Sequence, residues 1–250
     1  FKFNEDRFGF IDEVDMFMPS IWIGSNVMTV GKDADDIPYF NALGNERFYE
    51  IVKDVNTFVN KKGNFFNTFK EIPNGEQSRI DGRKSFANGY SLFHMTGFGK
   101  CLELREMEDN FGIVPVPKYD TEQTEYLSRI IDAWTNVALS CATDLERTSI
   151  ILETLAVESK NYVIPAIYEN AITQKGIRDD DSLEMLEIIQ KNRTLDLGDT
   201  VWQADIRNKY YEMVMNNKDN VASQTEKIVK KADKIISDAL EQVEELKSRG

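Results

Sequence analysis

The sequence predicts an α/β protein, because short apolar segments alternate along it with longer segments of helical periodicity. Between residues 48 and 59 the apolar side chains recur every three or four positions, which places them on one face of a helix. Residues 90–95 follow an Asn-Gly turn signal and have the composition of a strand. Strands interleaved with helices in this way are typical of α/β proteins.

The middle of the chain continues the alternation. Residues 111–117 are expected to be extended, in a strand leaving a sheet, because Pro115 and Pro117 cannot donate to a strand ladder. Residues 137–141 have the composition of a second, buried strand. A helix should follow, with Thr143 and Glu146 forming a capping box at its start.

The C-terminal part is predicted to be helical. Three acidic residues at 179–181 suit the start of a helix, where negative charge is favourable for the helix dipole. Ser223 and Glu226 are expected to cap the last helix, whose apolar stripe runs from residue 228 to residue 246. The stripe is too wide and irregular for a coiled-coil seam, so we expect this helix to pack on the body of the protein.

Composition limits the possible partners. A chain of 250 residues suffices for one large or two small domains. Its net charge of −13 disfavours nucleic acid and anionic membrane surfaces. No apolar run approaches the ~20 residues of a membrane-spanning helix. The chain opens on Phe1 and not on Met, from which we expect a processed or truncated product.

Several kinds of chemistry lack their motifs. There is no glycine-rich phosphate loop, and the single histidine, His94, is expected to be a hydrogen-bonded structural residue and not a metal ligand. The acidic run 33–36 resembles the start of a calcium loop, but it lacks the oxygen ligand at the fifth position, which is Ile37, and the glycine at the sixth, which is Pro38, so we expect a solvated turn. Cys101 and Cys141 are expected to be two small buried residues and not a required disulfide. We therefore expect no metal and no cofactor.

The many carboxylates leave one enzymatic alternative open. A pair of them across a cleft would suit a carboxylate-dependent glycoside hydrolase. Most, however, lie at helix starts or on polar faces, such as Glu241 and Glu244, and are expected to be solvated charges. A hydrolase would show paired carboxylates in unlike environments, whereas a sugar receptor would show aromatic surfaces and neutral hydrogen-bonding groups.

Two stretches carry a family resemblance. The first comprises residues 85–93, 97–99 and 104–120, and it includes the run Phe-Gly-Ile-Val-Pro-Val-Pro-Lys-Tyr-Asp. It resembles the second lobe of the family 1 extracellular solute-binding proteins of bacterial ABC importers. The second stretch comprises residues 144–168 and 194–199 and is similar to clostridial members. Together these likenesses span most of residues 6–215.

The resemblance implies a periplasmic-binding-protein fold of type II. Residues 1–128 and 176–250 would then form the second lobe, while residues 129–175 would cross the hinge and supply part of the first lobe. The protein would be a monomeric receptor without enzymatic activity, binding a carbohydrate and docking on a membrane permease of the ABC type. It would be extracellular and lipid-anchored at the surface of a Gram-positive bacterium, with the anchor outside this chain. Besides the sugar receptor and the glycoside hydrolase, a third possibility is an isolated lobe that does not bind a ligand.

The expected ligand site follows from the same resemblance. Its residues would be Trp202, Trp134, Phe98, Met18 and Asp15. In this reading Trp202 offers a flat surface to the apolar face of a sugar at the start of a helix, which is the role of a stacking aromatic in maltose-type binders. The alternative reading makes Trp202 a core residue that shares a helix face with Ile206 and Tyr210.

Overall fold

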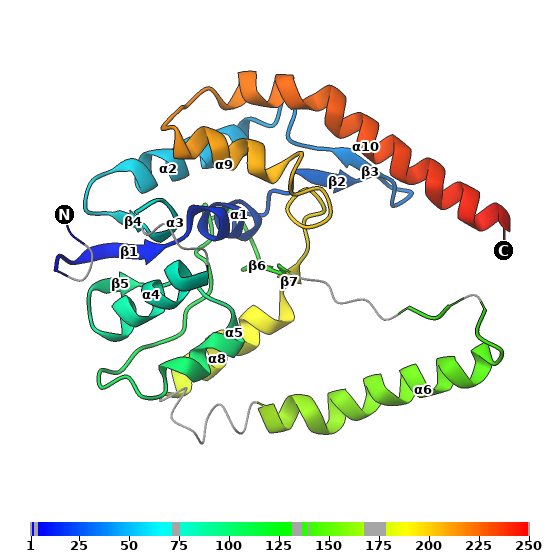
Figure 1. Ribbon diagram of the computed structural model, residues 1–250, viewed down its shortest axis with the longest axis horizontal. Coiled ribbons are helices and arrows are strands. Elements are labelled where there is room, and N and C mark those ends of the chain that lie inside the picture. Colours follow the sequence, from blue (N-terminus) through cyan, green and yellow to red (C-terminus); the bar gives the residue numbers. More distant parts are fainter. Residues whose placement is uncertain are drawn as a thin grey trace.

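The structure is a computed structural model with a small parallel sheet on the side of the N-terminus (Figure 1). The residues that it describes are 2, 5–71, 76–131, 137–139, 141–167 and 179–249. Strand β1 (Phe8–Asp12) lies between β4 (Phe65–Asn67) and β5 (Ser91–Phe93) and is parallel to both. The mixed α/β class predicted from the alternating pattern is confirmed.

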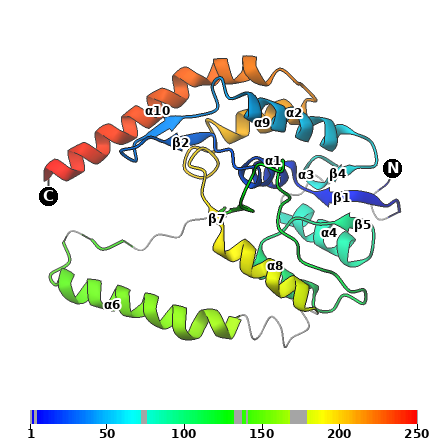
Figure 2. The same ribbon diagram turned by 180° about the vertical axis from the view of Figure 1, so that it is seen from behind.

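Helices cover both faces of this sheet (Figures 1 and 2). On one face lie α1 (Val14–Gly24), α2 (Glu46–Asn60) and α9 (Arg207–Met215), with α10 (Val221–Arg249) packed over them. On the other face lies α4 (Glu76–Ala87). The chain therefore passes from β1 to β4 over one face and from β4 to β5 over the other, which is a doubly wound arrangement.

The remaining elements surround this body. They are the antiparallel pair β2 (Val30–Lys32) and β3 (Pro38–Phe40), the parallel pair β6 (Ser128–Arg129) and β7 (Arg193–Thr194), the short helices α3 (Thr68–Glu71), α5 (Phe98–Cys101) and η1 (Leu102–Leu104), and the segments α6 (Leu145–Glu158), η2 (Ser159–Val163) and α8 (Asp180–Lys191). None of the described helices has the length and the apolar character needed to cross a membrane.

The main core is rich in aromatic side chains between the sheet and the covering helices. Phe10 of β1 packs edge-on against Phe17 of α1 at a centroid distance of 5.1 Å and against Phe58 of α2 at 5.8 Å. Phe65 of β4 joins the same group. Aromatic pairs in such edge-on contact stabilise a core beyond the area that they bury, and this group fixes α1 and α2 on the sheet.

Helix α6 has no buried side chain although it is 14 residues long. Its N-terminus is stabilised locally by the Asp144 carboxylate, which accepts a hydrogen bond from the Arg147 backbone N–H at 2.9 Å. Large apolar residues on α6, such as Ile151 and Leu155, are more than half exposed. Both ribbon views show α6 separated from the body (Figures 1 and 2).

Local patterns predicted the helices better than the strands. The helix over 48–59 is confirmed as α2, and the acidic start at 179–181 is confirmed because the Asp179 carboxylate accepts from the Ser182 backbone N–H at 2.7 Å. The helix after residue 143 is confirmed as well, but its cap is Asp144 and not Thr143. The strand over 90–95 exists only at Ser91–Phe93.

The buried strand predicted over 137–141 is wrong for the residues that the structure describes there. Residues 137–139 belong to no strand, and Val137 and Leu139 are 79% and 69% exposed. Cys141 is also exposed and Cys101 is half-buried, so the expectation of two buried cysteines fails as well, although both thiols are free as expected. Apolar composition predicts burial only where the fold brings a packing partner.

The last helix begins at Val221, two residues before the predicted cap. Its apolar stripe packs on the body through Val221, Ile228, Ala232 and Ile236, as predicted. The stripe does not stay covered to residue 246, because the C-terminal turns extend past the body (Figure 1). Residues 111–117 were expected in a strand, but they belong to neither a strand nor a helix.

Candidate ligand site at the carboxyl ends of the strands

Acidic residues and a histidine directly follow or end the parallel strands β1 and β5. Asp12 is the last residue of β1, Glu13 and Asp15 follow it, and His94 comes directly after β5. The strand order reverses between β1 and β5, and α/β sheets bind ligands outside the carboxyl ends of the strands at such a point. We call these four residues the carboxyl edge and treat it as the candidate site.

Asp12 organises the carboxyl edge. Its side chain is almost fully buried, and Oδ1 accepts a hydrogen bond from the Glu13 backbone N–H at 3.0 Å. Oδ2 accepts one from the Met95 backbone N–H at 2.6 Å. The Thr68 hydroxyl donates to the backbone oxygen of Asp12 at 3.3 Å. One residue thereby ties together the chain segments that leave all three strands.

His94 is held against Asp12 but keeps one free ring nitrogen. Its Nδ1 lies 3.5 Å from Asp12 Oδ2 and 3.3 Å from the backbone oxygen of Ile11, and its ring stacks on Phe86 at a centroid distance of 6.0 Å. These contacts confirm a hydrogen-bonded histidine. Its Nε2, however, is buried and has no partner among the described residues. This nitrogen therefore has unused hydrogen-bonding capacity.

Burial by itself lowers the pKa of His94, but the hydrogen bond and the charge of Asp12, with help from the Ile11 carbonyl, outweigh burial and raise the pKa above 6.5. We expect the single histidine signal in a proton NMR titration to shift with a midpoint above 6.5. The replacement Asp12→Asn should move that midpoint below 6.5, because only the burial effect then remains dominant.

The same shift makes stability depend on pH. Because the folded state binds the proton more tightly, the stabilisation by His94 is complete below the unfolded pKa of about 6.5 and is lost as pH rises through the folded pKa. Denaturant midpoints measured across this window should fall with rising pH, and the fall should be absent in His94→Gln. A wild-type titration midpoint at or below 6.5 would contradict the raised pKa.

The acids that follow β1 face α9. Glu13 is buried, and Oδ1 of Asp15 is a buried oxygen with no hydrogen-bond partner in the described part of the chain. Burial raises the pKa of the Tyr211 hydroxyl on α9, and the nearby charges of Asp15 and Glu13 raise it further. The hydroxyl therefore stays protonated at neutral pH and can donate a hydrogen bond.

The structure brings only one of the predicted ligand residues to the carboxyl edge. Asp15 lies there, in the first turn of α1. Met18 is 0% exposed and belongs to the main core, which corrects its assignment to a ligand-facing wall, because the helices α2 and α9 pack on α1 and the core encloses this side chain. Trp134 lies outside the residues that the structure describes.

The other two predicted residues occupy separate places. Trp202 is half-buried against the main core, next to fully buried Ile206. One part of its ring therefore packs in the core, as the core interpretation expects, and the other part is accessible, as the ligand-binding interpretation requires. It lies in a series of turns before α9 and not at the start of a helix, and its backbone N–H donates to Leu197 O at 2.9 Å. Phe98 packs in a small cluster on Leu186 of α8.

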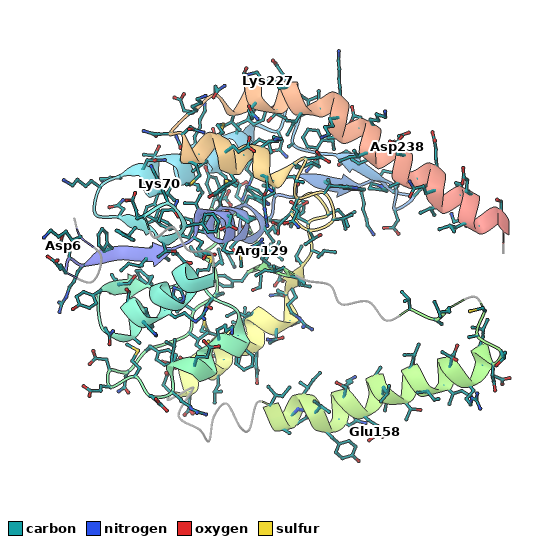
Figure 3. The ribbon with its side chains drawn as sticks, in the orientation of Figure 1. Asp6, Lys70, Arg129, Glu158, Lys227 and Asp238 are labelled. Atoms are coloured by element: carbon teal, nitrogen blue, oxygen red, sulfur yellow. The ribbon has the colours of Figure 1, made fainter. Side chains whose placement is uncertain are left out.

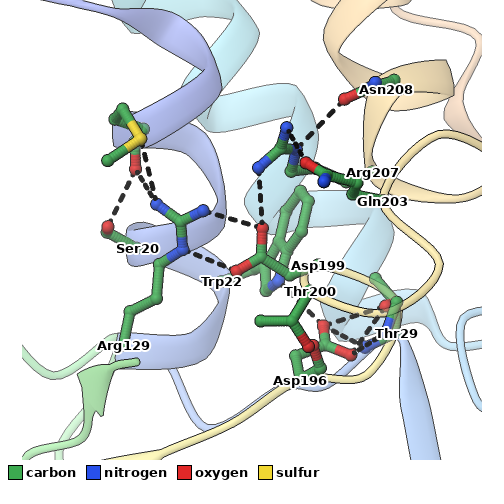
Figure 4. A network of polar contacts seen from close by, with 12 residues as sticks. Ser20, Trp22, Thr29, Arg129, Asp196, Asp199, Thr200, Gln203, Arg207 and Asn208 are labelled. Carbon is green, nitrogen blue, oxygen red and sulfur yellow. Dashed lines mark hydrogen bonds and ion pairs between the residues drawn. The ribbon is translucent and has the colours of Figure 1, made fainter. Parts of the chain in front are cut away.

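A buried carboxylate fixes the start of the loop that carries Trp202 (Figure 4). Asp196 is 0% exposed and accepts hydrogen bonds from the Trp22 indole N–H at 3.2 Å and from the backbone N–H of Thr29 at 2.9 Å. It also accepts from the Thr29 hydroxyl and from the backbone N–H groups of Val30 and Gly198. With so many donors, Asp196 holds the loop on α1 and β2.

A second buried carboxylate in the same loop is paired with arginine (Figure 4). Asp199 accepts two hydrogen bonds from the Arg129 guanidinium, Nε–Oδ2 at 2.6 Å and Nη2–Oδ1 at 2.8 Å, and Arg207 adds a contact at 3.4 Å. Arg129 also donates to the backbone oxygen of Met16 at 3.2 Å. Figure 3 shows Arg129 inside the body. The pair connects β6, α1 and the loop.

Sequence reasoning missed the functional potential of Asp12 and Glu13. The available signal was their position, because two acids follow directly on the apolar run of a strand, where side chains reach the carboxyl edge of a sheet. Asp196 and Asp199 gave no such signal, since they lie in a segment of turns without periodicity.

Comparison with known proteins yielded no match to this chain among protein-family models, curated proteins or solved structures. Within the described residues, no three acidic, histidine or cysteine side chains gather closely enough to hold a metal ion. What the fold and the site define is a doubly wound α/β protein with a polar, partly unsatisfied edge at its strand reversal.

Proposed function

We propose that this chain is a lobe of an extracellular solute-binding protein that binds a carbohydrate for an ABC importer. The observation that carries the proposal is the unused hydrogen-bonding capacity at the carboxyl edge, where Asp15 Oδ1 and His94 Nε2 are buried polar atoms without partners. Sugar hydroxyls both donate and accept hydrogen bonds, so they suit a carboxylate oxygen and an imidazole nitrogen alike. The acidic surroundings disfavour an anionic ligand.

The exposed segment 141–167 supports the receptor architecture. The main core draws its residues from 14–65 and 206–236, whereas α6 contributes no buried side chain. Large apolar side chains on α6, such as Ile151 and Leu155, are exposed. A contiguous exposed apolar surface is characteristic of a site that another protein surface covers. We propose that residues 129–175 cross a hinge to a further lobe, while residues 1–128 and 176–250 form the lobe described here, with a type II binding-protein topology.

The competing function is a carboxylate-dependent glycoside hydrolase. Two of the buried acids, Asp196 and Asp199, are poor candidates for its catalytic pair because hydrogen bonds from the protein already occupy their oxygens. Glu13 and Asp15 are therefore the candidate catalytic acids under the hydrolase hypothesis. Product analysis after incubation with oligosaccharides decides between the two, since a receptor releases its sugar unchanged.

Binding is best measured by NMR, which detects weak complexes of a single lobe. The expected result is that one class of oligosaccharide shifts the His94 ring signals and the backbone amides of residues 12–15. Asp15→Asn should weaken this binding, while the NMR spectrum of the variant remains that of a folded protein. If no sugar shifts these signals, the proposed function is contradicted, and if products accumulate, the hydrolase replaces it.

Trp202 provides the test of the aromatic surface. Trp202→Ala should keep the fold and weaken sugar binding by about 1–3 kcal/mol, the scale of one large apolar contact. Tyr39→Ala removes another partly exposed aromatic ring, on β3, and serves as a matched control that should leave sugar binding unchanged. Loss of folding without a selective binding defect would show that Trp202 is only a core residue.

A further inference from the structure

A groove lies between β4 and the C-terminal ends of α2 and α9, and it reaches Val14, which is adjacent in sequence to Glu13 and Asp15 of the carboxyl edge. Its volume is about 340 Å³, within the size range of small-molecule sites. Buried apolar side chains line it, namely Phe8, Val14, Phe65 and Val214, and Phe66 and Val59 continue this lining. The groove therefore offers an apolar surface suited to an aromatic ring.

One polar atom in the lining has no protein partner. Asn67, at the end of β4, has a buried Oδ1 without a hydrogen bond in the described structure. Its Nδ2 faces Met215 Sδ at 2.9 Å, and a thioether sulfur is a weak acceptor. Turning the amide over would leave the nitrogen unpaired in place of the oxygen. A ligand N–H or O–H group would satisfy this carbonyl.

The rim of the groove is locally positive. Lys62 and Lys70 line it together with Glu71, which gives the rim a formal charge of +1 in a chain whose net charge is −13. Lys70 is exposed, has no ion pair within the described residues, and is labelled at the side of the body in Figure 3. A carboxylate at this rim would find an attractive partner in Lys70.

We propose that this groove binds a small aromatic carboxylate that carries an N–H or O–H donor. The ring would pack on Phe8, Phe65 and Phe66, the donor would bond Asn67 Oδ1, and the carboxylate would lie at Lys70. The site does not depend on carbohydrate binding at the carboxyl edge, so either proposal can fail without the other.

Three commercial probes separate the contributions. Indole-3-acetate has the ring, the N–H donor and the carboxylate; 1-naphthaleneacetate lacks the donor; indole-3-ethanol lacks the charge. Titration of the isotope-labelled protein should shift the amides of β4, Val59 and Met215. Indole-3-acetate should bind about tenfold more tightly than 1-naphthaleneacetate, the effect of one buried hydrogen bond, and up to about fivefold more tightly than indole-3-ethanol, the effect of one exposed charge pair.

Matched variants assign each contact. Asn67→Leu should lower the affinity for indole-3-acetate to that for 1-naphthaleneacetate and leave the affinity for 1-naphthaleneacetate unchanged. It should not lower the melting temperature, because it replaces an unpaired polar group with an apolar one. Lys70→Gln should weaken both acids but not indole-3-ethanol. Val59→Phe fills the groove and should block all three probes. Leu155→Ser on α6 should change none of these affinities.

Several results would overturn the proposal. Equal binding of the three probes would exclude the contacts assigned to Asn67 and Lys70. Shifts confined to α6 would show that the probes bind only exposed apolar surface. Absence of binding up to the solubility limit of indole-3-acetate would show that the groove is no ligand site.

Discussion

Replacing Asp199 with alanine is expected to lower the free energy of unfolding by about 3–5 kcal/mol, the range for breaking a buried ion pair. The Asp199 side chain is 0% exposed and that of Arg129 is 3% exposed, so the change leaves a guanidinium buried without its counter-charge. The loop that carries Trp202 would also lose its connection to β6. Equilibrium unfolding in urea, read from the midpoint at unchanged slope, measures the loss.

Two controls separate the pair from a general effect of charge removal. The double variant Asp199→Ala with Arg129→Met should recover much of the loss, because the most deeply buried unpaired charge is then absent. Arg207 keeps its hydrogen bonds to Gln203 and Asn208. Glu212→Ala, which breaks the exposed pair with Lys209, should cost less than about 1 kcal/mol. A loss below about 1 kcal/mol for Asp199→Ala would show that the arginine is not confined as the structure describes.

Trp22→Ala is expected to have a comparably large effect, about 3–5 kcal/mol, since it removes a large side chain from a closed core. Trp22 is 0% exposed and packs edge-on against Phe48 of α2 at 5.7 Å and Tyr210 of α9 at 6.3 Å. Its indole N–H also donates to Asp196. The residue thereby connects three helices and the loop after β7.

Trp22→Phe distinguishes the ring from its donor. It keeps most of the aromatic contact and removes one of the donors to Asp196, so the expected cost is only about 1 kcal/mol. Trp202→Ala, at a half-buried position, should destabilise less than Trp22→Ala. Equal losses for the two tryptophan-to-alanine variants would mean that Trp202 is as much a part of the core as Trp22, which would weaken its proposed role in binding.

Helix α6 shows that a local sequence pattern predicts secondary structure but not burial. The sequence predicted a helix there because capping and helical spacing are interactions among neighbours, and Asp144 does cap it. The same apolar content suggested burial for residues 137–141, which was wrong for Val137 and Leu139. Whether an apolar side chain is covered depends on a partner that is distant in sequence, and no local pattern contains that information.

The candidate site could not be predicted for the same reason. Asp12 and His94 are more than 80 residues apart, and only the order β4-β1-β5 brings them together. Asp15 was predicted by resemblance and lies at this edge, whereas Met18, three residues later, is turned into the core. Positions three apart share one face of a helix, so the periodicity of α1 does not separate these two residues, and only the packing around α1 decides that Met18 is buried.

By itself the sequence determined the α/β class, the first residues of α2, α6, α8 and α10 to within a few positions, and the absence of motifs for phosphate loops and histidine-based metal sites. These follow from periodicity, capping and residue types, which act over one or two turns of the chain. The tertiary structure alone decided the reversal of strand order, the pairing of Asp12 with His94 and of Arg129 with Asp199, and the exposure of α6. Each of these depends on contacts between segments tens of residues apart, whose free energy is realised only when the whole body has folded.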